Sequence, residues 1–242
     1  MEPVTATDKT LMVLRSAITH RRFTDIVEDT GLAKATVHRI LQKLLSYGFL
    51  TFDEQYFPGP AMLSMASEAF DAIDISAVAT PVIHRLAHET GFTVHVGARN
   101  DNEAIYVAID NGRMPYRLPS HVGDRLSLHS TSIGKVLLAT SSPEYVADYA
   151  DHPGLNAKTP RTITNLTALT KELDRVREQG YALDDEENVP GIRCVGAPVT
   201  NYLGQVSHAV SVTTLAMENV NMHGLADEVV RAATEISYRL GS

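Results

Sequence analysis

The one cysteine of the chain, Cys194, is the side chain best suited to covalent chemistry. A cysteine nucleophile needs a nearby base and a group that orients that base. The chain contains ten histidines, but none stands in a recognisable local motif with Cys194. We therefore favour an inert cysteine buried in the wall of a cavity. The alternative is a small-molecule hydrolase that uses Cys194 or the acidic run 184–187.

That acidic run places four carboxylates in succession, from Asp184 to Glu187. A run of like charges is most often a solvated loop. The second interpretation is that one of the four carboxylates faces a pocket, and the charge pattern alone does not choose between the two.

The segment around Ser132 has the pattern of a helix start. Gly134-Lys135 lacks the Gly-x4-Gly-Lys-Ser/Thr spacing of a phosphate-binding loop, so we reject that function. Ser132 is instead predicted to cap a helix over Ile133–Thr140. Free backbone N–H groups and the helix dipole at such a start, here at residues 132–134, favour an anion such as a carboxylate. A capped helix without a ligand fits these residues equally well.

The segment 207–213 alternates as a half-buried strand does. One face carries small, mostly polar side chains, which suit a ligand cavity or solvent, and the other carries mostly apolar ones, which suit packing. The two faces are, in turn, Ser207, Ala209, Ser211 and Thr213, and His208, Val210 and Val212.

His84 and His88 stand four residues apart on a predicted helix, a spacing that can hold a zinc ion. Arg85 follows the first histidine where a metalloprotease motif requires Glu. We therefore expect an ordinary helix surface, and neither a metal nor another cofactor.

Nucleic-acid chemistry is indicated near the N-terminus, in a window without acids. No Asp or Glu lies between Asp29 and Asp53. Residues 1–60 hold seven basic and seven acidic residues, whereas 61–242 hold fourteen and twenty-two and so carry the whole net charge of −8. A local basic segment matters more for phosphate contact than the charge of the whole chain.

The elements around this window predict a winged helix-turn-helix. Helices are expected over 8–19, from a cap at Thr24 to Gly31, and over Ala33–Tyr47, followed by a hairpin of 49–52 and 55–57. The N-terminal part of the third helix would meet base edges in the major groove. The candidate contacts are Lys34, Ala35, Thr36, His38 and Arg39, with Lys43 on the phosphate backbone. A three-helix bundle with a solvated basic face is the alternative.

The rest of the chain interleaves helices with strands. Helices are predicted over 61–72, 75–89, 133–140, 143–149, 166–179 and 223–240, and strands over 93–99, 104–109, 194–200 and 205–213. This mixture indicates an α+β sensor domain. One cysteine excludes an internal disulfide framework and favours a reducing cytoplasm. The start lacks the layout of a signal peptide, and no apolar run approaches the ~18 residues that cross a bilayer.

The chain resembles the IclR family of transcriptional regulators over nearly its whole length, with the matching segments in the expected order. These segments are Gly31–Leu41, Gly48–Leu50, Tyr56–Pro60, Glu89–Gly91, Leu128–Lys135, Arg177–Ala182, Asp184–Glu187, Gly191–Val195 and Ser211–Thr213. Two positions depart from the family pattern. Ala35 stands where Ser is frequent, so one DNA contact is expected to be missing. Pro58 stands where an aliphatic residue is usual, which predicts a shorter wing.

The resemblance implies a winged helix-turn-helix over 1–60, a linker helix over 61–75 and an α/β, GAF-like effector-binding domain over 76–242. It implies a homodimer or homotetramer that binds an inverted-repeat operator in double-stranded DNA, in the cytoplasm and without a membrane. A small organic effector, a carboxylate or aromatic acid derivative, would modulate that binding. The effector contacts would be Ser132, Ile133, Gly134, Asp184, Cys194, Ser211 and Thr213.

Overall fold

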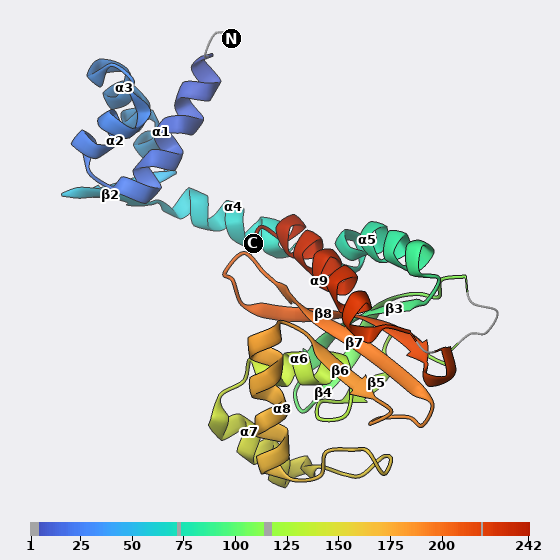
Figure 1. Ribbon diagram of the computed structural model, residues 1–242. Helices are drawn as coiled ribbons and strands as arrows, with labels where there is room; N and C mark the ends of the chain where they lie inside the picture. Colours follow the sequence, from blue (N-terminus) through green and yellow to red (C-terminus); the bar gives the residue numbers. More distant parts are fainter. Residues whose placement is uncertain (1–4, 72–73, 114–117, 219) are drawn as a thin grey trace. The chain divides into compact units, whose positions relative to one another are not determined.

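The computed structural model describes residues 5–71, 74–113, 118–218 and 220–242. The chain divides into two compact units, Met1–Ile73 and Asp74–Ser242. The first unit therefore includes all but the last two residues of the predicted linker helix, 61–75. Figure 1 labels most of the helices and strands of both units.

Three helices and a hairpin form the core of the first unit. The helices are α1 (Ala6–His20), α2 (Phe23–Thr30) and α3 (Lys34–Ser46). Their buried apolar side chains, among them Val13, Ile26 and Leu41, pack into one cluster with Leu50 and Tyr56 of the hairpin. The helical spacing of these residues is therefore what drives the three helices together.

The second helix begins earlier than the sequence indicated. Thr24 was predicted to cap it, but α2 begins at Phe23, with Arg22 at the N-cap and no side-chain cap. The Thr24 hydroxyl donates instead to the Asp25 carboxylate, 2.8 Å away. The earlier start places Phe23 against the core cluster, and this packing outweighs the missing cap.

The hairpin is the wing of the unit. It consists of β1 (Leu50–Asp53) and β2 (Gln55–Pro58), and helix α4 (Pro60–Asp71) follows. Pro58 was expected to shorten the wing, but it is the last residue of β2 and lies opposite Leu50. Proline is tolerated there because the end of an edge strand has no need of its N–H. The Tyr56 amide donates to the Arg21 carbonyl at 2.8 Å, which ties the wing to the corner between α1 and α2.

The second unit is built on one antiparallel sheet of six strands in the order β5-β4-β3-β8-β7-β6. The strands are β3 (Thr93–Asn100), β4 (Glu103–Asp110), β5 (Arg125–Ser127), β6 (Ala182–Asp185), β7 (Ile192–Thr200) and β8 (Val206–Leu215). The two edge strands, β5 and β6, were not predicted. They have three and four residues, too few for an alternation pattern to show.

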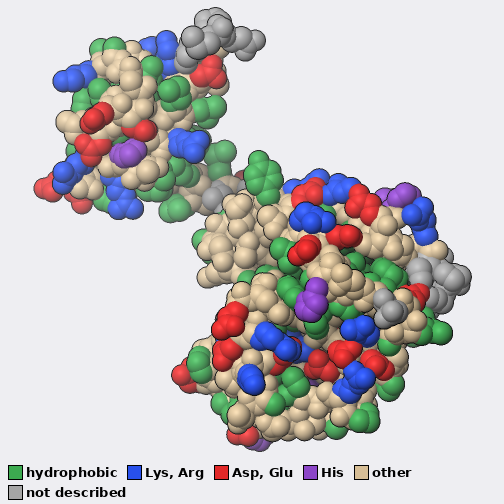
Figure 2. Space-filling model, viewed as in Figure 1, with side chains coloured by type: hydrophobic (Ala, Val, Ile, Leu, Met, Phe, Trp, Pro, Cys, Tyr) green, Lys and Arg blue, Asp and Glu red, His purple; other side chains and the backbone are tan. Residues whose placement is uncertain are grey.

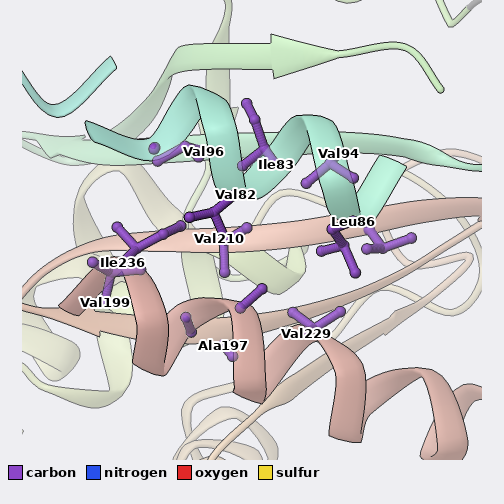
Figure 3. Close-up of a cluster of buried hydrophobic side chains, with 14 of the residues drawn as sticks. Val82, Ile83, Leu86, Val94, Val96, Ala197, Val199, Val210, Val229 and Ile236 are labelled. Atoms are coloured by element: carbon purple, nitrogen blue, oxygen red, sulfur yellow. The ribbon is translucent and has the colours of Figure 1, made fainter. Parts of the chain in front are cut away.

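Helices α5 (Ile75–Thr90) and α9 (Met222–Arg239) cover one face of this sheet. In Figure 3, Val82 and Leu86 of α5 and Val229 of α9 point toward the sheet residues Val94 and Val210. These side chains belong to the largest buried apolar cluster of the unit. The apolar face predicted for 207–213 thus packs against helices, as its pattern indicated.

A second cluster lies on the opposite face of the sheet, under helices α6 (Ser132–Ala139), α7 (Pro143–Tyr149) and α8 (Leu166–Gln179). A short π-helical turn, η1 (Ala150–Gly154), follows α7, and a 3-10 turn, η2 (Ala216–Glu218), follows β8. Helix α6 is wholly buried, so its position relative to the sheet is set by packing on every side.

Candidate functional site: a cavity at the start of α6 and a basic face on α3

Three glycines allow the start of α6 to lie directly against the sheet. A Cβ atom on Gly97 of β3 would stand 2.7 Å from Cγ2 of Ile133, and one on Gly196 of β7 would stand 3.1 Å from the Ser132 backbone. A Cβ on Gly134 would stand 2.5 Å from the Leu128 Cα. Any larger residue would push the helix away from the strands, so these glycines set the depth at which α6 begins.

A cavity of about 410 Å³ opens between this helix start and the sheet. Sheet register brings its polar residues together in two rows. Asp184 lies opposite Cys194, which lies opposite Thr213. In the adjacent row Gly196 lies opposite Ser211, which lies opposite His95. The lining includes His95, Tyr106, Ser120, Thr131, Ser132, Ile133, Asp184, Asn188, Cys194, Ser211 and Thr213.

Six of the seven predicted effector residues therefore line one cavity, and the seventh, Gly134, does not. Ser132 was predicted to cap α6, but Thr131 does so: its hydroxyl oxygen accepts from the Gly134 amide at 3.0 Å. The N–H of Gly134 thus already donates a hydrogen bond to Thr131. What Gly134 contributes is the absence of a side chain. The amides of Ser132 and Ile133 lie in the first helical turn, where no intrahelical acceptor exists. They remain free to donate to a ligand.

Asp184 is the acid of the run that faces the cavity. Its Oδ1 atom accepts from the backbone amides of Glu187 at 2.8 Å and Asn188 at 3.3 Å. Burial raises the pKa of Asp184 to about 7, and the nearby Glu187 adds to this effect against the lowering by the backbone amides and Lys135. About half of the Asp184 side chains are therefore neutral near pH 7, which reduces the repulsion that an anionic ligand would meet.

The other three acids of the run form ion pairs. Glu187 binds the fully buried Lys135 of α6, with 2.6 Å between Oε1 and Nζ. Lys135 also contacts Glu172 of α8 at 3.1 Å. Asp185 and Glu186 pair with Arg161 at the surface. The run is neither a solvated loop throughout nor a single site, because Glu187 binds the buried Lys135 whereas Asp185 and Glu186 share the surface residue Arg161.

A chain of hydrogen bonds connects Cys194 to the far wall of the cavity. The Cys194 thiol lies 3.3 Å from the Thr213 hydroxyl, and that hydroxyl lies 3.4 Å from His95 Nδ1. His95 Nε2 lies 2.9 Å from the hydroxyl of Ser120. The His95 ring stacks on Tyr106 with 4.3 Å between ring centroids. Burial lowers the pKa of His95 to about 4, so the ring is neutral at physiological pH.

This arrangement does not activate Cys194 as a nucleophile. Burial and the nearby Asp184 carboxyl raise the pKa of the thiol, which disfavours the reactive thiolate. Thr213 stands between the thiol and His95. The geometry fits the inert, cavity-lining cysteine better than the hydrolase.

His95, Tyr106 and Ser120 were not singled out from the sequence. They lie in the cavity because β3 pairs with β8, which follows it by more than a hundred residues, and because the segment before β5 returns over the sheet. His95 falls in the predicted strand 93–99, but nothing in that strand indicates its partner. His84 lies apart from the cavity, with its Nδ1 atom 2.8 Å from the Asp110 carboxylate.

The predicted DNA contacts lie along α3 in the first unit. Lys34, Ala35, His38, Arg39 and Lys43 are exposed, and Thr36 is half-buried. In the described part of this unit, none of its Lys or Arg side chains forms an ion pair; the one pair found there joins His20 to Asp29. In the second unit, by contrast, most Arg side chains are paired, and acidic and basic side chains lie next to one another in Figure 2. The cations of α3 are thus available to phosphates.

The comparisons with known proteins agree with both units. The model of the IclR helix-turn-helix domain matches residues 6–54, and that of the bacterial transcriptional regulator IclR C-terminal domain matches residues 67–238. The chain belongs to the IclR family of transcriptional regulators. It therefore combines a helix-turn-helix that binds DNA with a C-terminal effector-binding domain.

Relatives and solved structures match over almost the full length. The HTH-type transcriptional regulator XynR of Escherichia coli K12 is 32% identical over 228 residues, which cover 92% of this chain and 90% of XynR. The HTH-type transcriptional repressor AllR of Salmonella typhi is 33% identical, over 90% of this chain and 82% of AllR. The crystal structure of IclR from Thermotoga maritima has a TM-score of 0.66 at 28% identity and covers 98% of both chains.

A putative IclR regulator from Silicibacter sp. TM1040 is similar in fold, with a TM-score of 0.85 at 23% identity, covering 98% of this chain and 96% of that one. Among the described helices of this chain, none is both long and apolar enough to cross a membrane.

Replacing Gly134 tests its steric role. We expect Gly134→Ala to lower the free energy of unfolding by about 1–3 kcal/mol, because the new methyl group meets backbone atoms of Leu128 and Ser127. Gly224→Ala is the matched control: Gly224 is also the third residue of a capped helix, but its new Cβ meets only the Asn221 side chain. Urea unfolding of both variants measures the difference. Equal effects would contradict the close approach.

Replacing Asp184 by Asn tests its protonation. The native state holds a proton up to about pH 7 that the unfolded chain releases near pH 3.8, so this group lowers stability as pH rises between these values. Asn does not titrate, and its amide oxygen keeps the backbone contacts. The melting temperature of Asp184→Asn minus that of the wild type should therefore rise from pH 4.5 to 7 and then level off. A difference in melting temperature that does not change with pH would refute the raised pKa of Asp184. His95, whose pKa is lowered, changes stability in the opposite direction, but it is present in both proteins and cancels in the subtraction.

Proposed function

We propose that this IclR regulator binds a small organic effector in the cavity at the start of α6, and that the effector changes the affinity of α3 for an operator. The observation that carries this proposal is that free amides and hydroxyls belong to the lining of one cavity. Ser132 and Ile133 come from the start of α6 and Ser211 from β8, and all three line this cavity.

The chemistry of the lining supports a small carboxylate or aromatic acid derivative. Free amides at a helix start favour a carboxylate. The stacked pair of His95 and Tyr106 offers an apolar, flat surface beside it. Asp184 would either donate from its protonated form or accept from a second polar group on the ligand, such as a hydroxyl or an amide. A cavity of about 410 Å³ suits a small ligand.

The effector would act by stabilising one of two arrangements of a homodimer or homotetramer. Paired DNA-reading units bind an inverted repeat because the symmetry of the protein matches that of the site. A ligand shifts this equilibrium only by its difference in affinity for the two arrangements. The relative AllR is named a repressor, so we propose that this chain also represses transcription. We propose no catalytic step, because Cys194 lacks a base in contact.

DNA recognition is tested by gel shift and footprinting on the DNA upstream of the chain's own gene. We expect protection of an inverted repeat whose half-sites lie about one helical turn, or a multiple of it, apart. Arg39→Ala should weaken operator binding, by about 1–3 kcal/mol if Arg39 reads a base. A single isolated half-site bound by a monomer, or equal binding by the variant at every salt concentration, would contradict the proposal.

Effector recognition is tested by calorimetry with a panel of small carboxylates and aromatic acids. Ser211→Ala and Asp184→Ala should each weaken binding of any ligand that alters DNA affinity, while DNA binding without ligand stays unchanged. Ser207→Ala is the matched control, since Ser207 shares the strand face of Ser211 but does not line the cavity. Full ligand affinity in both variants would place the effector site elsewhere.

A further inference from the structure

A second concave surface lies in the first unit, between α1 and α3. This groove has a volume of about 280 Å³. The polar residues that line it are Lys9 and Thr10 from the first turns of α1, and Thr36, Arg39 and Lys43 from α3. No sequence pattern indicated Lys9 or Thr10 as functional residues.

The α3 residues of the groove lie along one edge of the helix. Thr36, Arg39 and Lys43 are spaced three and four residues apart, which places them on one stripe. The buried side of α3, with Val37 and Leu41, packs on the core. The groove therefore runs along the side of the helix that would enter the major groove of DNA, where the phosphate backbone borders it.

The groove is cationic and its charges are not neutralised. Lys9, Arg39 and Lys43 form no ion pair with any described residue, unlike the buried Lys135 of the second unit. The acid next to Lys9, Asp8, is bound elsewhere: its carboxylate accepts from the amide and the hydroxyl of Thr5, at 2.8 and 2.6 Å, in the capping box of α1.

The wing is a poor site for a phosphate by comparison. Asp53 and Glu54 form its tip and are both exposed. Like charges in an exposed tip would repel the DNA backbone. The wing's one arginine contact is made at the other end, where Arg21 lies over the ring of Phe57, 5.2 Å from its centroid.

We propose that the groove between α1 and α3 is a phosphate-binding site, in which Lys9 of α1 and Arg39 and Lys43 of α3 hold the DNA backbone. The inference rests on the proposed binding of an operator by α3. It adds α1 to the DNA interface and assigns Arg39 to the backbone. A phosphate contact positions the protein on DNA but carries no sequence information.

The test measures binding of the full chain to two labelled duplexes, one from the DNA upstream of its own gene and one of the same length with scrambled sequence, at several salt concentrations. Lys9→Gln should lower the slope of log K against log salt by about 0.9, the value for one lost phosphate contact. Its affinity for both duplexes should fall by the same factor. Arg15→Gln is the control, because Arg15 lies on another face of α1 beside Met12 and Thr19; its slope should equal that of the wild type.

The outcomes separate this inference from the proposed function. If the wild type does not distinguish the two duplexes, operator recognition itself fails. If the wild type distinguishes them but Lys9→Gln keeps the wild-type slope, the phosphate site is refuted alone. A change in the ratio of the two affinities would also refute it, since that would assign Lys9 to sequence reading. Equal melting temperatures of Lys9→Gln and the wild type show that folding is not the cause.

Discussion

The close approach of α6 to the sheet is the constraint on which the second unit depends. Glycines at 97, 134 and 196 remove the side chains that would otherwise hold the helix start away from β3, β7 and the backbone at Leu128. The approach buries α6 on all sides and places its first two residues, Ser132 and Ile133, in the cavity lining. The same contact thus contributes to the core and to the site, since a helix shifted outward would lose its packing against the sheet and would no longer line the cavity.

A buried ion network holds the acidic segment to that helix. Lys135 of α6 binds Glu187 and Glu172, while the Glu187 amide donates to Asp184. Glu187 Oε2 is buried without a partner among the described residues, and burial raises the pKa of this carboxyl. Breaking such a network is costly because a buried charge is left unpaired. A ligand that moves Asp184 would therefore also move Glu187, and through Lys135 it would act on Glu172 of α8, because breaking these contacts is costly.

The two units use their charges in opposite ways. In the second unit, cations such as Lys135 and Arg161 form internal ion pairs, so they are not free to bind phosphates. Residues 1–60 hold equal numbers of basic and acidic residues, yet the Lys and Arg side chains of the first unit make no ion pair within the described residues. A chain with a net charge of −8 can thus present a local surface that is suited to phosphate.

Much of this organisation can be predicted from the sequence alone, because a helix or strand with one apolar face shows a regular spacing of apolar residues. The three N-terminal helices, the hairpin and the two faces of the strand at 207–213 follow from local spacing, and resemblance to a family selected Asp184, Cys194, Ser211 and Thr213. The predicted N-cap of α6 was wrong by one residue, because Thr131 and Ser132 both carry a hydroxyl that can cap a helix. The cap is Thr131 and not Ser132. The short edge strands carry too few residues to show a period.

Only the tertiary structure decided which distant residues meet. His95 faces Ser211 because β3 pairs with β8, and Lys9 faces Arg39 because α1 packs beside α3. Gly134 packs against the backbone of Leu128, which occupies the place of a side chain, and it does not line the cavity. The raised pKa of Asp184 likewise arises from burial by elements remote in sequence. The spacing of residues along the chain determines which face of a helix or strand a side chain occupies. What that face packs against depends on contacts between segments that are distant in the sequence.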